Sequence, residues 1–350
     1  MDGYAFWRET DTDLAVTFDC VGDSLAGHPF LGTLAAGECI RITTGAEVPA
    51  VANTVVMQEN CSRQGQRVRM QTQAQLGNNI RPPGHDIGLG DVIVAPGKQL
   101  NAFDISWLAA CGLVEIEVTA KPRIAVFSTG DELLEPGGVL SAGKIYDANR
   151  RTLLELLKKL PVVVTDLGIL PDLHAHIHDA LLQASRQHDV LLTTGGVSVG
   201  DADFVKAVVD EIGRIDLWRL NLKPGKPLAF GQIGDCLFFG LPGNPVSAIV
   251  TYLLIAQPAL IELCGGTSAR VYGYRALLAQ PLEHREGREE YQRGLLDYSA
   301  ASLQVRISED QSSNRLASFT KADCLVRIPK NVGNLALGEE VEVLPFFALF

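Results

Sequence analysis

Apolar runs that end in polar, glycine-rich turns recur through the middle of the chain. The clearest covers residues 191–204 (LLTTGGVSVGDADF), where two leucines lead into threonines, glycines and aspartates. A short apolar run bounded by a turn is typical of a buried parallel strand. Glycines let backbone N–H groups approach a ligand closely, and aspartates are ligands for divalent cations. The segment therefore predicts either an anion and cation site at a strand end or an ordinary tight turn with a polar rim.

Strand and helix patterns alternate on both sides of this segment. Residues 124–127, 162–164 and 236–239 have the pattern of buried strands. Leucines at positions 153, 156, 157 and 160 form one stripe of a helix that Asp147 can cap. This alternation predicts an α/β fold with a central, mostly parallel sheet flanked by helices. Ligands bind such sheets at the carboxyl ends of the strands.

The flanking regions predict β structure. Before residue 100, strand patterns such as 39–42, 54–57 and 67–73 alternate with turns, while residues 1–5, 43–46 and 81–86 have loop compositions. Residues 101–112 predict a short helix ended by glycine, and the patterns at 303–307, 325–328 and 341–344 predict a small C-terminal β-barrel or sandwich. The expected domains are an N-terminal β domain (1–85), a connecting helical segment (86–120), an α/β domain (121–266) and a C-terminal β-barrel domain (267–350).

Composition narrows the class of protein. Hydrophobic residues make up 47% of the chain and charged residues 20%, which is an ordinary globular composition. The net charge of −11 argues against sequence-independent binding of nucleic acid. Seven scattered cysteines without a C-x-x-C pair fit reduced thiols. No signal-peptide pattern is seen, and the apolar stretch 246–260 is interrupted by Gln257 and Pro258. We therefore expect a cytoplasmic protein with neither nucleic acid nor membrane as a partner.

Other turns of the predicted sheet also carry functional residue types. Residues 129–132 and Asp172 supply carboxylates, and Asn244 with Pro245 predicts a helix start whose free N–H groups can hold an oxyanion. Residues 219–227 (RLNLKPGKP) place three cations in a stiff loop. Carboxylates beside phosphate-holding glycines favour Mg²⁺ and chemistry at a phosphate centre. Each turn alone also fits an ordinary helix start or a solvated loop.

Six motifs follow one another along the chain. They are MDGYA at residues 1–5, RITTGA at 41–46, STGDEL at 128–133, TGGVSVG at 194–200, KPGKP at 223–227 and LPGNPVS at 241–247. Together they closely resemble the MoeA-type molybdopterin molybdotransferases, which are related to the E domain of gephyrin. The resemblance covers the whole chain. It implies a molybdopterin-binding fold for residues 121–266, and it implies that residues 86–120 are part of a domain whose N-terminal piece is absent. It implies Mg²⁺-dependent insertion of molybdate into adenylylated molybdopterin, with release of AMP, in the biosynthesis of the molybdenum cofactor.

The resemblance also implies partners and site residues. It implies a homodimer with an active site shared between subunits, and contacts with the molybdopterin adenylyltransferase and with apoproteins of molybdoenzymes. The residues implied as catalytic are Asp2, Thr44, Asp86, Glu132, Asp172 and Asp203, and the last three would also hold the metal. Those implied as substrate-binding are Arg81, Gly195, Gly196, Ser198, Arg219, Lys223, Pro242, Pro245, Arg293 and Ser313.

Two departures from the family pattern leave alternatives open. Arg219 stands where family members often carry lysine, which keeps the charge but changes the geometry. The chain starts at the MDGYA motif, whereas family members have some tens of residues before it, so either the true start lies upstream or this copy is truncated. The alternatives to the enzyme are a non-catalytic or truncated molybdopterin-binding scaffold of the same fold and the adenylyltransferase itself. The retained carboxylates favour the enzyme.

Overall fold

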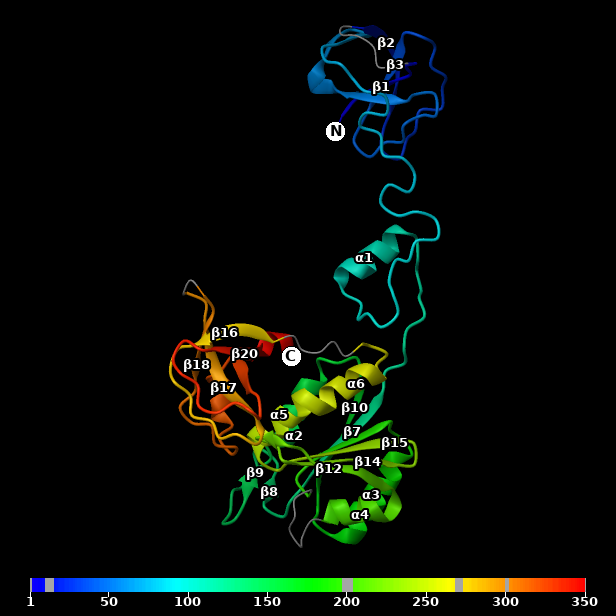
Figure 1. The fold of residues 1–350 in the computed structure, drawn as a ribbon. Helices are drawn as coiled ribbons and strands as arrows, with labels where there is room; N and C mark the ends of the chain where they lie inside the picture. Colours follow the sequence, from blue (N-terminus) through cyan, green and yellow to red (C-terminus); the bar gives the residue numbers. More distant parts are fainter. Residues whose placement is uncertain (1, 10–15, 197–203, 268–272, 300–301, 350) are drawn as a thin grey trace. The chain divides into compact units, whose positions relative to one another are not determined.

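Figure 1 shows the fold of the chain as a computed structural model. The chain divides into two compact units, Met1–Val92 and Ile93–Phe350, and each has hydrophobic cores of its own. The structure describes residues 2–9, 16–196, 204–267, 273–299 and 302–349.

The N-terminal unit is built on one six-stranded sheet in the order β4-β1-β3-β2-β6-β5. The expected strands at 39–42 and 54–57 are confirmed, whereas the pattern at 67–73 continues as a strand only to Met70. The expectation that residues 1–5 form a loop is wrong, because β1 pairs with both β3 and β4 and buries Tyr4 and Ala5. The strands are β1 (Gly3–Phe6), β2 (Thr17–Ser24), β3 (Glu38–Ile42), β4 (Thr54–Met57), β5 (Cys61–Gln64) and β6 (Arg67–Met70), with a 3₁₀ turn at Gln58–Asn60.

The larger unit contains the α/β fold predicted by the alternating patterns. Its central sheet has the order β10-β7-β11-β15-β14-β12, in which the first four strands are parallel, β14 pairs antiparallel with β15, and β12 pairs antiparallel with β14. The fold class is therefore confirmed. The strands are β7 (Arg123–Thr129), β10 (Val163–Leu170), β11 (Val190–Thr194), β12 (Arg214–Arg219), β14 (Pro227–Ile233) and β15 (Cys236–Leu241), and a small β8–β9 pair (Leu133–Leu134, Ile145–Tyr146) follows β7.

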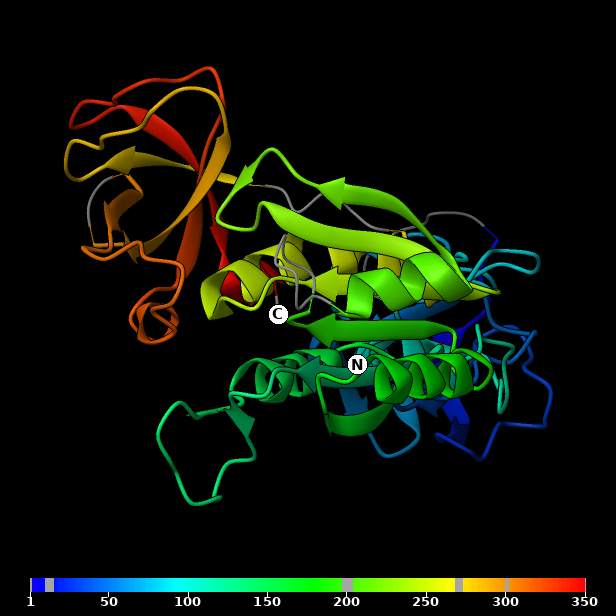
Figure 2. The same cartoon turned by 90° about the horizontal axis from the view of Figure 1, so that it is seen from below.

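Helices cover both faces of this sheet, as Figures 1 and 2 show. Ile124 and Val190 pack on the side of α2, α5 and α6, whereas Phe127 and Leu191 pack on the side of α3 and α4. Because helices bury both faces of the sheet, the strand sequences are continuous apolar runs and do not alternate between apolar and polar residues. The helices are α2 (Asn149–Leu157), α3 (His174–Ser185), α4 (Phe204–Ile212), α5 (Pro245–Thr251) and α6 (Gln257–Leu263).

The apolar run after residue 245 forms one long helical segment rather than the broken stretch expected. A π-helical turn (Tyr252–Ala256) joins α5 to α6, and Pro258 lies in the first turn of α6, where proline is tolerated. By length and composition alone Pro245–Leu263 is long and apolar enough to cross a membrane. It is 56% buried, however, between the sheet and the C-terminal strands, and the Gln257 amide donates to the carbonyl of Leu349 at 2.8 Å.

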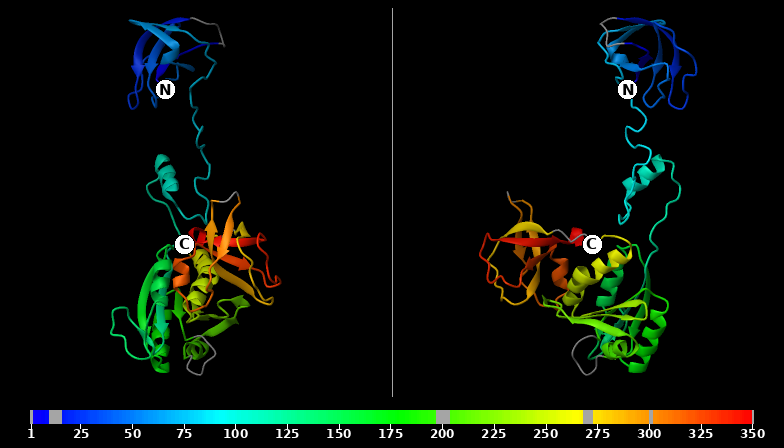
Figure 3. Two further views of the ribbon diagram at one scale, coloured as in Figure 1. Left: turned by 90° about the vertical axis from the view of Figure 1, so that its left-hand side faces the viewer. Right: turned by 45° about the vertical axis from the view of Figure 1, so that its right-hand side comes forward.

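The C-terminal strands close into the small barrel that their patterns predict, seen from two sides in Figure 3. The order β17-β18-β16-β20-β19 closes because β19 also pairs with β17, and the short β13 pairs with β17 from outside. The expected helix at 101–112 is confirmed as α1 (Ala102–Ala110), which Asn101 caps. The remaining elements are β13 (Leu222–Lys223), β16 (Tyr274–Leu278), β17 (Glu289–Asp297), β18 (Gln304–Ile307), β19 (Cys324–Ile328) and β20 (Glu340–Pro345), with short helices α7 (Ala317–Thr320) and α8 (Phe346–Leu349).

Candidate active site

The glycine turn after β11 is packed so closely that side chains are excluded from it. Gly195 and Gly196 have φ values of 85° and 65°. A Cβ on Gly195 would lie 2.8 Å from the carbonyl oxygen of Thr129, and one on Gly196 would lie 2.7 Å from the Thr129 Oγ1. The Thr129 and Thr193 hydroxyls are buried and have no hydrogen-bond partner among the residues that the structure describes. Buried hydroxyls are normally paired, so these two are suited to a ligand oxygen.

The ends of β7 and β15 lie beside this turn, and the end of β10 lies next to that of β7. A Cβ on Gly243, after β15, would lie 3.8 Å from the Cα of Gly195, and the Glu132 carboxylate lies against Gly130 at the end of β7. Asp172 follows β10, whose last residue, Leu170, is the register partner of Thr129. Glu132 and Asp172 therefore follow neighbouring strand ends, as the sequence predicts.

These carboxylates fit a magnesium ion that its substrate helps to hold. Among the described residues no group of three histidine, cysteine, aspartate or glutamate side chains forms a preformed metal site. Mg²⁺ keeps several waters and commonly binds through one or two carboxylates together with a substrate phosphate. Glu132 and Asp172 supply two carboxylates at neighbouring strand ends, which is the ligand type and number that such a site uses. Asp203 and Ser198, which were also expected in the site, lie outside the described residues.

A cavity of about 370 Å³ lies between the loop after β12 and the C-terminal barrel. It brings together three of the expected substrate-binding residues, Lys223, Arg293 and Ser313. Its charged side chains are four cations and a single carboxylate, so it is suited to an anion. The lining residues are Leu222, Lys223, Pro224, Gly225, Lys226, Pro227, Ser247, Arg288, Glu290, Tyr291, Arg293, Gln311, Ser312 and Ser313.

Arg293 carries a fully buried positive charge at this cavity. Its Nε donates to Ser318 Oγ at 3.0 Å, and its Nη2 donates to the carbonyl oxygens of Asp310 and Ser312 at 3.1 and 3.2 Å. No ion pair joins it to a carboxylate in the described part of the chain. Burial lowers the pKa of the Arg293 guanidinium, because desolvation disfavours the charged form. The same contacts order the loop that carries Ser313.

Glu290 sets the position of Lys223 on the cavity wall. This carboxylate is buried on β17 and lies 2.9 Å from the Lys223 Nζ, and it accepts a hydrogen bond from the Gln292 amide at 3.1 Å. His284 Nε2 lies 3.6 Å from its second oxygen. Sequence reasoning missed Glu290 and the neighbouring Arg288. The available signal was the charged run EEYQR inside a barrel strand, where inward positions are normally apolar.

The loop after β15 connects the glycine turn to the cavity. Gly243 lies beside the glycine turn, and the backbone N–H of Val246 donates to the carbonyl oxygen of Ser313 at 3.0 Å. Pro242 and Pro245, both expected in the site, lie within this connection. Asn244 and Pro245 begin α5, as their sequence predicts.

The cationic segment 219–227 is more ordered than the expected loop. Arg219 ends β12 opposite Pro227, and Lys223 lies in β13 beside β17. The expectation of a loop throughout is wrong, because backbone pairing with two different sheets holds the segment at both ends. Arg219 is exposed and does not line the cavity.

Four expected site residues belong to the N-terminal unit. Asp2 accepts hydrogen bonds from the backbone N–H of Thr44 at 3.0 Å and from its hydroxyl at 3.3 Å. The backbone hydrogen bond from Thr44 lowers the pKa of the Asp2 carboxyl. Arg81 and Asp86 are exposed in a segment without helix or strand. The structure thus brings Asp2 and Thr44 together.

Three family models match the chain in succession. The model described as "MoeA N-terminal region (domain I and II)" matches residues 1–112. The model described as "Probable molybdopterin binding domain" matches residues 125–262, and "MoeA C-terminal region (domain IV)" matches residues 275–346.

Individual proteins match over most of the chain. The molybdopterin molybdenumtransferase of Haemophilus influenzae is 38% identical over 349 residues, which are 99% of this chain and 86% of that protein. Gephyrin of Dictyostelium discoideum is 31% identical over 343 residues, which are 87% of this chain and 48% of gephyrin. The solved structure of a molybdopterin biosynthesis MoeA protein from Pyrococcus horikoshii has a TM-score of 0.83 at 25% identity, and the match covers 98% of this chain and 86% of that one.

Proposed function

Because this chain belongs to the MoeA-type molybdopterin molybdenumtransferases, enzymes of molybdenum cofactor biosynthesis, we propose that it inserts molybdate into adenylylated molybdopterin with Mg²⁺ and releases AMP. The observation that carries the proposal is the cationic cavity, which connects through one loop to a glycine turn beside two buried hydroxyls that no described residue pairs. Both reactants are anions, and the two features supply two neighbouring places for them.

The cavity is the proposed binding place for molybdate. Lys223, Lys226 and Arg288 are exposed cations at its wall, and the buried Arg293 adds a charge that forms no ion pair with a described carboxylate. Hydrogen bonds between charged groups and oxyanions are stronger than neutral ones. The Ser313 hydroxyl adds a donor on the same wall.

The glycine turn is the proposed place for the phosphate side of adenylylated molybdopterin. Gly195 and Gly196 form a tight turn at the end of a parallel strand, and the Thr129 and Thr193 hydroxyls can donate to the oxygens of a phosphate. Glu132 and Asp172 would hold Mg²⁺, which when bound would neutralise charge on the phosphate group that leaves as AMP. The chain's own residues then bind and orient the two anions, which lowers the entropy cost of bringing them together.

A homodimer is the proposed assembly. Helix α1 and the segment after it expose several large apolar side chains, and exposed apolar groups of this kind mark interaction surfaces. Phe103 is 83% exposed, Val114 96% and Val118 70%. In a symmetric dimer, the same surface of a second copy of the chain would cover these side chains. The roles expected for Asp2, Thr44, Arg81 and Asp86 stay predictions.

The cavity is tested by the variant Lys226→Gln in a reconstituted reaction with adenylylated molybdopterin, molybdate and Mg²⁺. AMP release and activation of an apo-molybdoenzyme are measured together. Loss of one charge-assisted hydrogen bond is expected to raise the KM for molybdate about tenfold. The control Lys158→Gln changes a lysine directly after α2 whose side chain is 66% exposed, and it should leave the KM unchanged.

Three outcomes separate the proposal from its alternatives. AMP release that stops on removal of Mg²⁺ with EDTA supports the enzyme. Binding of adenylylated molybdopterin without turnover by the wild-type chain would favour the non-catalytic scaffold. A Lys226→Gln variant with the wild-type KM would contradict the assignment of the cavity to molybdate.

A further inference from the structure

We propose that the start of helix α2, residues 147–150, positions the turns of the candidate active site by tying together three strands of the central sheet, two at their carboxyl ends and one at Asp166 within the strand. The strands are β7, β10 and β15, and the ties come from Asp147, Asn149 and Arg150. The ligand of the site is inferred from the proposed function and rests on it. The ties themselves are hydrogen bonds and ion pairs between described residues. The three side chains are positioning residues, since they act on the turns rather than on the substrate.

The first tie joins the helix start to the end of β7. Asp147 is buried, and its Oδ2 accepts a hydrogen bond from the Ser128 hydroxyl at 2.6 Å. Its Oδ1 accepts one from the backbone N–H of Arg150 at 3.1 Å. Ser128 directly precedes Thr129, whose hydroxyl faces Gly196. An aspartate that the sequence predicts only as a helix cap therefore also holds the strand end beside the glycine turn.

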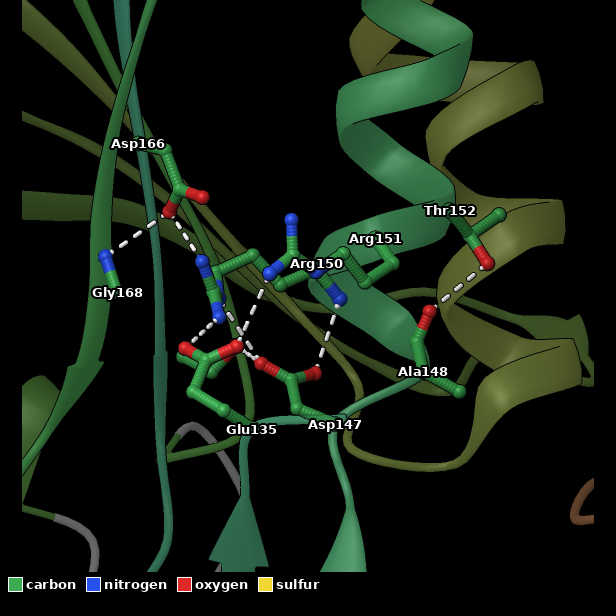
Figure 4. Close-up of polar contacts among 9 residues, drawn as sticks. Glu135, Asp147, Ala148, Arg150, Arg151, Thr152, Asp166 and Gly168 are labelled. Atoms are coloured by element: carbon green, nitrogen blue, oxygen red, sulfur yellow. Dashed lines mark hydrogen bonds and ion pairs between the residues drawn. The ribbon is translucent and has the colours of Figure 1, made fainter. Parts of the chain in front are cut away.

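The second tie runs through Arg150, whose side chain lies at the centre of the cluster in Figure 4. It is 1% exposed, and its Nε donates to Asp147 at 3.0 Å. The other guanidinium nitrogens pair with Asp166 on β10 and with Glu135 just after β8. A planar guanidinium can meet three carboxylates from different elements, whereas an ammonium group cannot match that geometry. The turn that carries Glu132 is thus held to β10 and α2 together.

The third tie reaches the loop after β15. Asn149 Nδ2 donates to the carbonyl oxygen of Gly243 at 2.7 Å, across 94 positions of the sequence. Gly243 lies beside Gly195, whose backbone N–H donates to the carbonyl oxygen of Leu241 at 3.2 Å. One side chain on α2 therefore holds the loop after β15, which lies beside the glycine turn.

Native-state hydrogen exchange on the full chain tests the ties independently of the reaction. Asn149→Ala removes the contact with Gly243 and leaves the buried charges intact. Exchange of the Gly195 and Val246 amides is expected to become about fivefold faster, as for the loss of one hydrogen bond. The amide of Val326, in the barrel, should exchange at the wild-type rate.

The same measurement tests the guanidinium tie. In Arg150→Lys, the amides of Leu133 and Ile145 should exchange at least about fivefold faster, because they bond to the carbonyl oxygens of Gly130 and Glu132 within the tied turn. Arg151→Lys is the matched control. Arg151 is the next residue, is 55% exposed and makes one ion pair, with Glu135 at 3.1 Å. Its variant should leave both rates unchanged.

Kinetics then connect the ties to the site. A positioning role predicts that Asn149→Ala and Arg150→Lys raise the KM for adenylylated molybdopterin about fivefold, while kcat per folded molecule changes less than about twofold. A purely structural role would lower the amount of folded protein and leave the KM of the folded fraction unchanged. The fraction folded is measured by circular dichroism at the assay temperature.

Each result decides one question. Wild-type exchange rates in both variants would overturn the proposal, and so would faster exchange with an unchanged KM. If the wild-type chain neither binds adenylylated molybdopterin nor releases AMP, the proposed function fails. In that case exchange that quickens at the tied turns and not at Val326 still supports the ties, and unchanged exchange overturns them.

Discussion

At the scale of single residues, the candidate site contains buried polar and charged groups that lack their usual partners among the described residues. It also contains a glycine that has no space for a side chain. The Thr129 and Thr193 hydroxyls are buried without a partner among the described residues, and Gly196 is closed in by Val205 and Thr129. Arg293 is buried with neutral acceptors around it. Such features cost stability, so they are typical of functional sites rather than of ordinary cores.

The crowding at Gly196 gives a stability prediction. In Gly196→Ala the new Cβ would lie 2.5 Å from Val205 Cγ2, in addition to the strain of a φ of 65°. We expect urea denaturation to show a loss of about 2–4 kcal/mol, from backbone strain and overpacking together.

A second glycine separates these two causes. Gly234 has a similar φ, 59°, but no atom lies within 4 Å of a Cβ built on it. Gly234→Ala should therefore lose only the strain of about 1 kcal/mol. Equal losses in the two variants would show that crowding at Gly196 has no effect.

At the scale of elements, the site depends on how neighbouring strands are held in register. Arg123 begins β7 and Asp189 precedes β11, and their side chains meet at 2.9 Å while the Asp189 carboxylate also accepts the backbone N–H of Arg123 at 2.7 Å. This pair lies at the opposite ends of the strands from the glycine turn. Strand register set at one end is transmitted to the other, because the backbone ladder between them is continuous.

The same pair predicts how stability depends on pH. The hydrogen bond from the Arg123 side chain holds the pKa of Asp189 below its ordinary value of 3.8. A carboxyl with a lowered pKa stabilises the fold above its unfolded-state pKa and loses that contribution as the pH falls through the folded-state value. The melting temperature should therefore fall less between pH 5 and pH 3 in Asp189→Asn than in the wild type. Asp235→Asn, in an exposed turn, is the control and should follow the wild-type curve.

At the scale of the whole molecule, the apolar side chains of α1 and the segment after it are the feature that a single chain does not explain. Phe103 and Val114 are large, apolar and exposed, although α1 has a capping box that defines its start well. A helix that is well formed but apolar on its exposed surface is expected to meet another protein surface.

The dimer proposal predicts the effect of changing these side chains. Sedimentation of the wild-type chain should give the mass of two copies, and the double variant Phe103→Ser with Val114→Ser should shift the equilibrium to one copy. The matched control Leu337→Ser removes an apolar side chain that is 67% exposed on the C-terminal domain, and it should not change the mass. A wild-type chain that sediments as a monomer would contradict the proposal.

The sequence by itself determined the features that depend on local patterns. Apolar runs located the parallel strands, glycine turns located the strand ends, and Asn244 with Pro245 located the start of α5. The six motifs indicated the family, which the comparisons confirm. These succeed because hydrogen bonding and side-chain alternation within a few residues decide the type of element.

Only the tertiary structure decided which of these groups meet. It showed that Glu290 and Arg293 are buried at a cavity with Lys223, whereas the charged run EEYQR in the sequence does not say what these side chains contact. It also showed that Asn149 contacts Gly243, 94 positions away in the sequence. It showed further that the apolar run after residue 245 forms one helical segment that is 56% buried. Contacts between distant residues depend on how the elements pack and on the burial that packing creates, and periodicity within one element carries no information about either.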